Sequence, residues 1–179
     1  ETEGSASDTH GKFIAEPFEK GYGHTVGHSL RRILLSSLEG SAVTAVRIKG
    51  APHEFSSLKG VQEDVITLIL NVRQLRVKMS ASAAETLTLK KKGGEVKGKH
   101  IEVPTGVEIL NPDLVLAHLD ASGELEMEID VTRGRGYSSA DRLKKEGQPV
   151  NTIPVDALFS PVTKVHYEVE NARVGQMTD

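Results

Sequence analysis

The chain has 179 residues and a formal net charge of -3; 37% of its residues are hydrophobic and 26% are charged. This length suits one domain or two small ones with a substantial core. The absence of cysteine excludes disulfides, thiol nucleophiles and cysteine-ligated metals, and it fits a reducing cytoplasm. No apolar run reaches the ~18 residues of a membrane span. The lack of tryptophan, the 4% of aromatic residues and the slight acidity disfavour a stand-alone nucleic-acid binder.

The first third of the chain predicts a strand, a helix and a second strand after a polar lead-in. Lys12–Phe18 is a short apolar segment followed by a glycine-rich turn, which is typical of a strand. Thr25–Leu38 is an amphipathic helix, and Gly40 is positioned to end it. Ser41–Lys49 alternates as a strand does. The apolar stripe of the predicted helix consists of Val26, Leu30, Ile33, Leu34 and Ser37.

The rest of the chain predicts one more helix and several strands. Val61–Arg73 has an apolar stripe, with acidic residues in its first turn, where they suit the helix dipole. Period-two patterns predict strands over Arg76–Met79, Thr86–Leu89, Glu124–Val131 and Val162–Val169, a tight connection over Lys90–Gly94 and a loop over Arg133–Val150. The predicted fold class is therefore α+β, with two helices on a largely antiparallel sheet.

Two patterns near the first helix could carry chemistry, but each has a simpler structural explanation. His24 and His28 are four residues apart, yet Thr25 stands where a zinc protease has glutamate, and no third ligand follows. The glycines of residues 21–27 miss the dinucleotide spacing and favour a tight turn, although phosphate binding at this helix start stays open. No catalytic triad or phosphate loop is visible, so we expect no catalytic residues, no metal and no cofactor.

The segment Arg133-Gly134-Arg135-Gly136-Tyr137 could face a binding partner. Arginine can bind phosphate in two-point contacts and tyrosine can stack on a base. However, one copy does not make an array, and acidic residues surround it. We favour a loop that offers Arg133, Arg135 and Tyr137 to a protein partner, because both residue types are enriched at interfaces.

Both predicted helices also carry apolar residues away from their main stripe. Leu35 lies about 180° around the first helix from Val26, beside Arg31 and Arg32. The second helix likewise places Ile66 and Leu70 off its stripe, next to Arg73. An apolar residue framed by arginine is typical of a docking site. Either another chain or loops of this chain would cover these residues.

Four stretches stand out as long motifs: Glu16–Ser37, Gly60–Asp64, Arg133–Tyr137 and Val155–Val162. Together they closely resemble the N-terminal domain of the alpha subunits of bacterial RNA polymerase. The likeness resumes over Tyr167–Thr178 and covers nearly the whole chain from Lys12.

The resemblance implies a non-catalytic assembly platform: two alpha subunits dimerise and then recruit the beta and beta-prime subunits for DNA-templated transcription. It implies a discontinuous dimerisation subdomain, a helix on antiparallel sheet, over residues 1–39 and 166–179. A β-rich subdomain over residues 40–165 would be inserted between these parts. We expect a cytoplasmic protein with no membrane association and no direct DNA contact from this region.

The resemblance also implies a role for particular residues. Arg31, Arg32 and Leu35 would contact the beta subunit, and Arg73, Val155 and Val162 would contact the beta-prime subunit. The stripe of the first helix would form part of the dimer face with a second copy.

Several positions depart from the family pattern. His28 stands where the family commonly has asparagine, and Thr67 stands where some members carry an acidic contact residue. Residues 142–146 are shorter and more basic than the acidic loop with which some members meet an activator, so that role is not transferred. The family continues beyond the position of Asp179 with a long helix that completes the dimer. We therefore expect this chain to be a weak dimer or a monomer at micromolar concentration.

A second functional class stays open on the sequence. The chain could be an autonomous module that binds a small ligand or nucleic acid through the turn at residues 21–27 and the segment 133–137.

Overall fold

The computed structural model describes residues 7, 9–80, 83–144 and 147–171 and the backbone of 173–174 and 177–178. The chain divides into two compact units. The first unit comprises residues 1–35 and 164–179, and the second comprises residues 36–163.

The first unit is built around one long helix, α1 (Tyr22–Ser36). None of its residues is buried. The helix begins three residues before the predicted start and ends two residues before the predicted stop. Its end at Ser36 leaves Ser37 in the turn that follows, so Ser37 does not belong to the helical stripe. In the same unit, β10 (Arg173–Val174) pairs antiparallel with β11 (Met177–Thr178).

Two strands predicted from local composition do not form. Residues 12–18 and 162–169 are both free of regular secondary structure. A strand needs a hydrogen-bonded neighbour, and neither segment forms a ladder with any described part of the chain. The apolar content of these segments is therefore not sufficient to make them strands.

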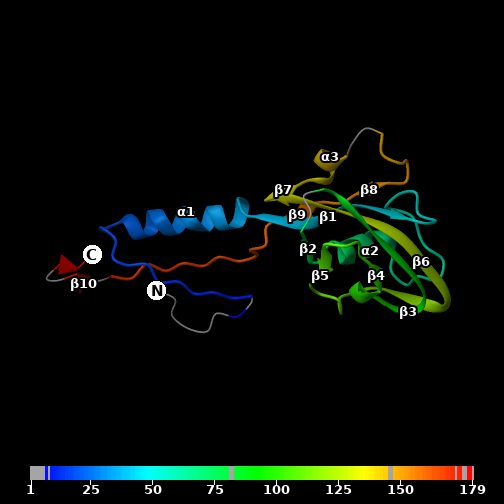
Figure 1. The fold of residues 1–179 in the computed structure, drawn as a ribbon, viewed down its shortest axis with the longest axis horizontal. Helices are drawn as coiled ribbons and strands as arrows, with labels where there is room; N and C mark the ends of the chain where they lie inside the picture. Colours follow the sequence, from blue (N-terminus) through cyan, green and yellow to red (C-terminus); the bar gives the residue numbers. More distant parts are fainter. Residues whose placement is uncertain are drawn as a thin grey trace. The chain divides into compact units, whose positions relative to one another are not determined.

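The second unit contains a five-stranded antiparallel sheet in the order β4-β3-β6-β1-β8 (Figure 1). Its long members are β1 (Glu39–Ile48), β3 (Glu85–Lys97) and β6 (Val115–Arg135), and its short edge strands are β4 (Ile101–Glu102) and β8 (Ile153–Pro154). The 3₁₀ turn η1 (Gly98–His100) joins β3 to β4. β2 (Val77–Met79) pairs separately with β5 (Val107–Ile109), and β7 (Tyr137–Ser138) pairs with β9 (Ala157–Leu158).

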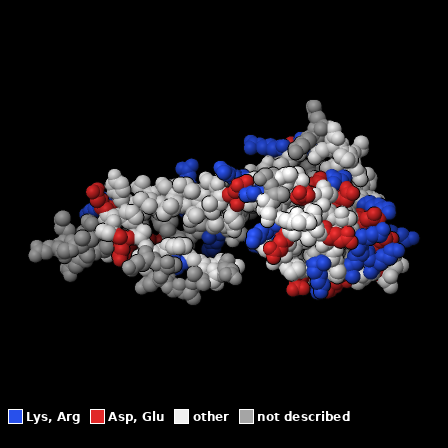
Figure 2. Space-filling model, in the orientation of Figure 1, with Lys and Arg blue, Asp and Glu red and all other residues white. Residues whose placement is uncertain are grey.

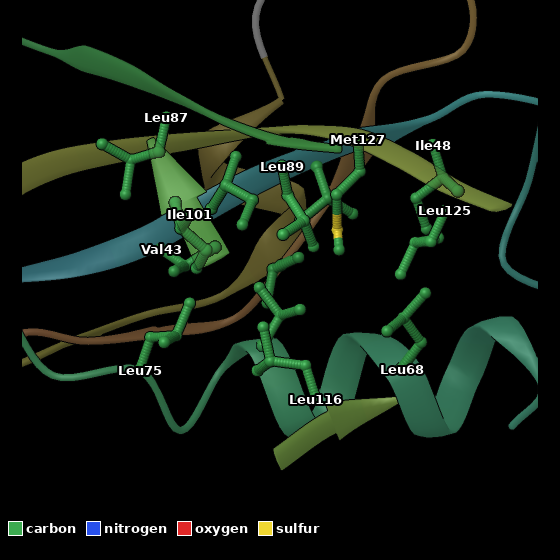
Figure 3. Packing of buried hydrophobic residues seen from close by; sticks show 14 of the residues in the cluster. Val43, Ile48, Leu68, Leu75, Leu87, Leu89, Ile101, Leu116, Leu125 and Met127 are labelled. Carbon is green, nitrogen blue, oxygen red and sulfur yellow. The ribbon is translucent and has the colours of Figure 1, made fainter. Parts of the chain in front are cut away.

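The helix α2 (Val65–Val72) covers one face of this sheet (Figure 3). Asp64 caps it by accepting a 2.7 Å hydrogen bond from Thr67 N, which explains its start four residues later than predicted. Val65, Leu68 and Val72 are fully buried, whereas Ile66 and Leu70 are exposed. This confirms that the latter pair lies off the core face.

The core lies between α2 and the inner face of the sheet (Figure 3). The predicted inward residues of β6 are all buried: Leu125, Met127, Ile129 and Val131. Leu87 and Leu89 of β3 and Val43, Val46 and Ile48 of β1 complete this layer. The α+β fold class is thus confirmed.

The predicted connection over Lys90–Gly94 is wrong, because these residues lie inside β3. The three lysines pair in register with Glu126, Leu125 and Glu124 of β6. Gly93 and Gly94 have positive φ angles of 58° and 74°, which only glycine adopts readily. The register shifts there, so the glycines bend a continuous strand.

The predicted loop over Arg133–Val150 is also wrong in its first part. Arg133 and Arg135 belong to β6 and pair with Ser41 and Glu39 of β1, while Tyr137 opens β7. The short helix α3 (Ala140–Leu143) follows. β1 pairs with residues 133–135 and keeps this glycine-containing segment extended. Local composition alone does not indicate this pairing.

Candidate subunit-interaction surfaces

Within the first unit, residues 165–169 pack along one face of α1. A Cβ atom on Gly27 would lie 2.5 Å from Tyr167 Cδ2, and one on Gly23 would lie 2.8 Å from Val169 Cγ1. Both approaches are shorter than real Cβ contacts. Arg31 Nε donates a 3.4 Å hydrogen bond to Val165 O. Positions 23 and 27, spaced four apart, therefore lie on the covered face of the helix, and the exposed Arg31 follows them one turn later.

The predicted apolar stripe lies beside this covered face. Leu30 and Ile33 are 49% and 52% exposed, while Val26 and Leu34 are half-buried. An amphipathic helix normally buries its stripe. Four of the five predicted dimer-face residues thus lie on α1, with Leu30 and Ile33 exposed, whereas Ser37 follows the end of the helix.

The predicted beta-subunit contacts lie at the carboxyl-terminal end of the same helix. Arg31 and Arg32 are exposed, and Leu35 is half-buried. The hydrogen bond to Val165 fixes the Arg31 side chain along the helix.

The second unit separates the predicted beta-prime contacts. Arg73 ends α2 and is exposed, and Val162 is half-buried. Val155 is only 3% exposed and belongs to the hydrophobic core. Its main-chain amide donates a 2.9 Å hydrogen bond to Thr44 O, which attaches it to β1. Core packing therefore encloses the Val155 side chain, which offers little surface to a partner.

Tyr137 forms a side-chain hydrogen bond with Asp156, and the charge of Arg73 acts on it. Partial burial raises the pKa of Tyr137, and so does its hydrogen bond to the Asp156 carboxylate. The charge of Arg73 acts in the opposite direction. Asp156 Oδ1 also accepts a 2.8 Å hydrogen bond from Ala140 N at the start of α3. The Asp156 carboxylate is therefore held between the Tyr137 hydroxyl and the amide at the start of α3.

The other two residues of the predicted partner-facing segment lie at the end of β6. Arg133 Nη2 forms a 3.3 Å ion pair with Glu39 Oε2 on β1, whereas Arg135 is exposed. Only Tyr137 of the three therefore joins the group around Asp156.

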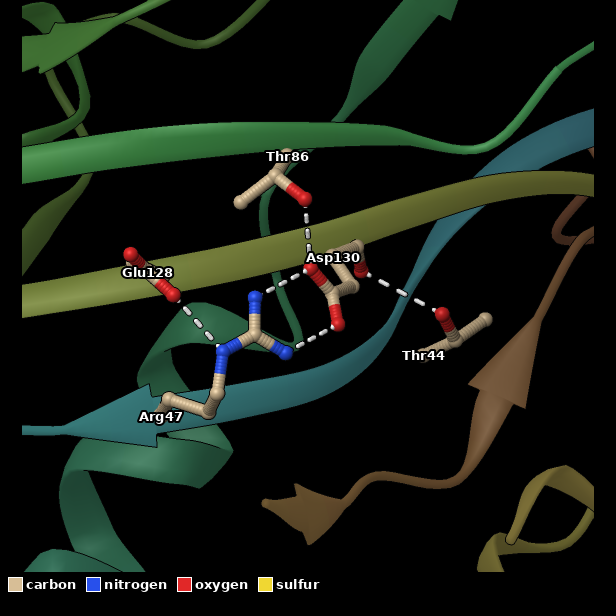
Figure 4. A network of polar contacts seen from close by, with 5 residues as sticks. All are labelled: Thr44, Arg47, Thr86, Glu128 and Asp130. Carbon is tan, nitrogen blue, oxygen red and sulfur yellow. Dashed lines mark hydrogen bonds and ion pairs between the residues drawn. The ribbon is translucent and has the colours of Figure 1, made fainter. Parts of the chain in front are cut away.

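A polar network holds the outer face of the sheet (Figure 4). Arg47 Nη1 and Nη2 donate to the two carboxylate oxygens of Asp130 at 2.6 and 2.8 Å, and its Nε donates to Glu128 at 2.7 Å. Thr86 Oγ1 donates to Asp130 Oδ1 at 2.8 Å, and Thr44 Oγ1 donates to the Asp130 carbonyl at 3.3 Å. The hydrogen bonds to Asp130 raise the pKa of Arg47 despite its partial burial. The network therefore ties β1, β3 and β6 together.

Basic and acidic side chains interleave on the surface of the second unit (Figure 2). Glu126 lies 2.8 Å from Lys49 Nζ and 3.9 Å from Lys90 Nζ, and Glu124 lies 3.7 Å from Lys92 Nζ. The lysine run thus contributes to cross-strand charge pairs rather than to a purely positive surface.

Glu63 joins the segment before α2 to β6. Its Oε1 accepts a 2.6 Å hydrogen bond from His118 Nδ1, and its Oε2 accepts a 2.8 Å bond from His118 N. Burial raises the pKa of Glu63, but the hydrogen bonds from His118 outweigh this effect and lower it overall. Both carboxylate oxygens are therefore used to hold the chain.

The described residues contain no group of three histidine or carboxylate side chains that could hold a metal ion. In the same part of the chain, no helix is long and apolar enough to span a membrane.

Comparison with known proteins decides the family. The family described as "RNA polymerase Rpb3/RpoA insert domain" matches residues 46–160. The chain belongs to the bacterial RNA polymerase alpha-subunit family.

Curated alpha-subunit relatives match nearly the whole chain. The DNA-directed RNA polymerase subunit alpha of Carboxydothermus hydrogenoformans is 52% identical over 97% of this chain and 56% of its own length. The subunit from Geobacter metallireducens is 52% identical over 98% and 52%, and that from Deinococcus radiodurans is 54% identical over 95% and 50%. The chain thus spans about half the length of these alpha subunits.

Sequence reasoning missed two residues of this alpha-subunit chain that the structure places at the surface around Tyr137. Asp156 follows the buried Val155, and Leu158 lies opposite Tyr137 across β7 and β9. In the sequence, the apolar residues 155, 157 and 159 alternate with Asp156, but Leu158 is also apolar and the stretch is short, so the signal is weak.

Proposed function

We propose that this chain acts as a non-catalytic assembly platform: it pairs with a second copy and recruits the beta and beta-prime subunits of RNA polymerase in the cytoplasm. The main support for this proposal is the apolar stripe of α1. Leu30 and Ile33 are exposed, and none of the 15 residues of this helix is buried. Such a stripe gains stability when another surface covers it.

In this proposal, the part of the chain at residues 1–39 and 166–179 dimerises, and residues 40–165 form the insert. Val26, Leu30, Ile33 and Leu34 pair with the same helix of a second copy. The contact is isologous, because a twofold dimer uses the same patch on both subunits.

We assign the beta-subunit contact to Arg31, Arg32 and Leu35. Arginine beside a partly buried leucine provides an apolar anchor with a charged rim. We assign the beta-prime contact to Arg73 and Val162 in the second unit. Val155 lies in the hydrophobic core of this unit and supports its fold.

The alternative of a ligand-binding module loses its structural support. Val169 and Tyr167 lie against Gly23 and Gly27, so these glycines serve packing. Residues 133–135 belong to a paired strand, and Arg133 is already engaged by Glu39.

Reconstitution with purified subunits tests the proposal. Tagged chain is incubated with the beta subunit, then with beta-prime, and the retained proteins are identified. We expect the chain to retain beta, and beta-prime to join the resulting complex. Failure to retain either large subunit would contradict the proposal.

A further inference from the structure

The strand β3 folds back on itself at its two adjacent glycines. Ile101 follows soon after the end of β3, yet it pairs with Leu89 near the middle of that strand. This pairing requires the part of β3 beyond Gly93 and Gly94 to return over the part before them. The short turn η1, which lies between β3 and β4, is therefore held against residues of β3 that precede the bend.

Lys91 occupies an inward position of β3. Leu87 and Leu89 of the same strand are fully buried, and alternate residues of a strand share one face. Lys91 continues this inward series and is half-buried. Two residues onward along each chain from the pair of Leu89 and Ile101 lie Lys91 and Lys99. The register thus brings two lysines toward each other beside η1.

His100 ends η1 and joins these two lysines. Its Nδ1 accepts a 2.9 Å hydrogen bond from Lys97 N, so the neutral imidazole carries its proton on Nε2. That Nε2 has no hydrogen-bond partner among the residues that the structure describes. Burial lowers the pKa of His100, and the charges of Lys91 and Lys99 lower it further. Both ammonium groups therefore lie near the ring.

The positive charge at this end of the sheet is only partly balanced. Lys97 Nζ lies 2.9 Å from Glu95 Oε2 and also interacts with the charge of Asp113. Glu95 acts on Lys99 only through space. Neither Lys91 nor Lys99 forms an ion pair or a side-chain hydrogen bond with the described part of the chain. Like charges that face each other across strands are destabilising, so an anion between them would stabilise this end of the fold.

We propose that Lys91, Lys99 and the Nε2–H of His100 form a binding site for a phosphate group. Lysine binds phosphate as a point charge, and the imidazole N–H adds a hydrogen-bond donor. The three residues include no arginine, whose planar fork matches a carboxylate. The phosphate is either the free inorganic ion or the end group of a phosphate monoester. None of these residues belongs to a surface assigned above to a polymerase subunit.

A titration of the intact chain with inorganic phosphate at physiological salt tests this site. We expect saturable shifts in the NMR amide signals of Lys91, Lys99 and His100. Bound phosphate should also raise the pKa of His100, because a neighbouring anion favours the imidazolium form. Lys91→Met and Lys99→Met should each weaken phosphate binding by about tenfold, as expected when one charge-assisted hydrogen bond is lost.

Lys78→Met is the matched control, because Lys78 is an exposed lysine on the strand β2 of the same unit. It should leave phosphate binding unchanged. Thermal unfolding in phosphate-free buffer shows whether each variant folds. Lys99→Gln, a change at an exposed position, replaces any variant that does not fold.

A second titration, with glycerol 3-phosphate, distinguishes the two sources of the phosphate group. Tighter binding of the monoester would indicate a phosphate carried by a larger molecule, and tighter binding of inorganic phosphate would indicate the free ion; either result supports the site. Shifts that do not saturate, or variants at Lys91 and Lys99 that bind phosphate like the Lys78 control, would overturn it. Equal affinity for acetate would overturn the assignment to phosphate. The test needs no polymerase subunit, so its result is independent of the proposed function.

Discussion

Arg47 of β1 and Asp130 of β6 lie diagonally across the ladder and share two hydrogen bonds of 2.6 and 2.8 Å. Both side chains are largely buried on the outer face of the sheet. A third strand is tied to this pair, because Thr86 of β3 donates a hydrogen bond to Asp130. Glu128 of β6 accepts a further hydrogen bond from Arg47. The pair therefore matters for stability in a way that an exposed ion pair does not.

Arg47→Ala should lower the free energy of unfolding by about 3–5 kcal/mol, because it leaves the Asp130 charge without its main partner. Lys49→Ala is the control: its ion pair with Glu126 is exposed and should cost no more than about 1 kcal/mol. Urea denaturation measures both. Equal losses in the two variants would show that burial of the Arg47 pair is unimportant.

Glu63 should make stability depend on acid pH. Its pKa lies below the ordinary value of 4.5, so the folded chain binds this proton less readily than the unfolded chain. The contribution is present above pH 4.5 and is lost as the pH falls through the lower folded pKa. Glu63→Gln should therefore flatten the fall in stability between about pH 5 and pH 3. A Glu63→Gln profile parallel to that of the wild type would contradict this assignment.

Gly40 approaches the main chain of Phe159 so closely that no side chain fits between them. Gly40→Ala should destabilise the second unit by about 1–3 kcal/mol, the usual cost of overpacking. The shift of the thermal midpoint, compared with that of Ser41→Ala on the same strand, measures this effect. An unchanged midpoint for Gly40→Ala would mean that β1 and the Phe159 segment separate without cost.

The core could be read from the sequence where the hydrophobic period is long and regular. The alternation of Leu125 to Val131 and the exposure of Ile66 and Leu70 both follow directly from spacing. The capping role of Asp64 could also be predicted, because aspartate is among the preferred residues at the N-cap of a helix.

Pairing between strands that are distant in sequence explains why some elements were predicted wrongly. Lys90–Gly94 and Arg133–Tyr137 have the composition of turns, yet a neighbouring strand supplies hydrogen bonds that keep both extended. The reverse holds at residues 12–18, where apolar composition suggests a strand but no partner strand lies alongside in the described chain.

The site was predicted only as far as residue identity allows. Arg32, Arg73 and Leu35 were named because apolar and arginine side chains stood on unexpected helix faces. Leu158 and Asp156 could not be named in the same way, since their role depends on the ladder between β7 and β9 and on the start of α3.

Substitutions on α1 should separate self-association from fold. Leu30→Asp should abolish dimer formation, because it places a charge in the middle of the apolar stripe. Thr25→Asp, also exposed on α1, should leave it intact. Sedimentation equilibrium over a range of concentrations measures both, and a Leu30→Asp chain that dimerises like the wild type would exclude this stripe from the dimer face.

Arg32→Ala should block recruitment of the beta subunit while the fold stays intact. Loss of an interfacial arginine typically costs about 2–5 kcal/mol of binding, whereas a surface change costs the fold about 0.5 kcal/mol or less. A pull-down with the beta subunit and a thermal melt report the two effects separately. Normal retention of beta by the variant would contradict this role.

The copy number of the chain in a complex with the beta and beta-prime subunits tests the platform account most directly. Light scattering on the purified complex gives this number from its mass. The account predicts two copies of the chain with one of each large subunit. Large subunits that associate with each other while the chain elutes alone would contradict it.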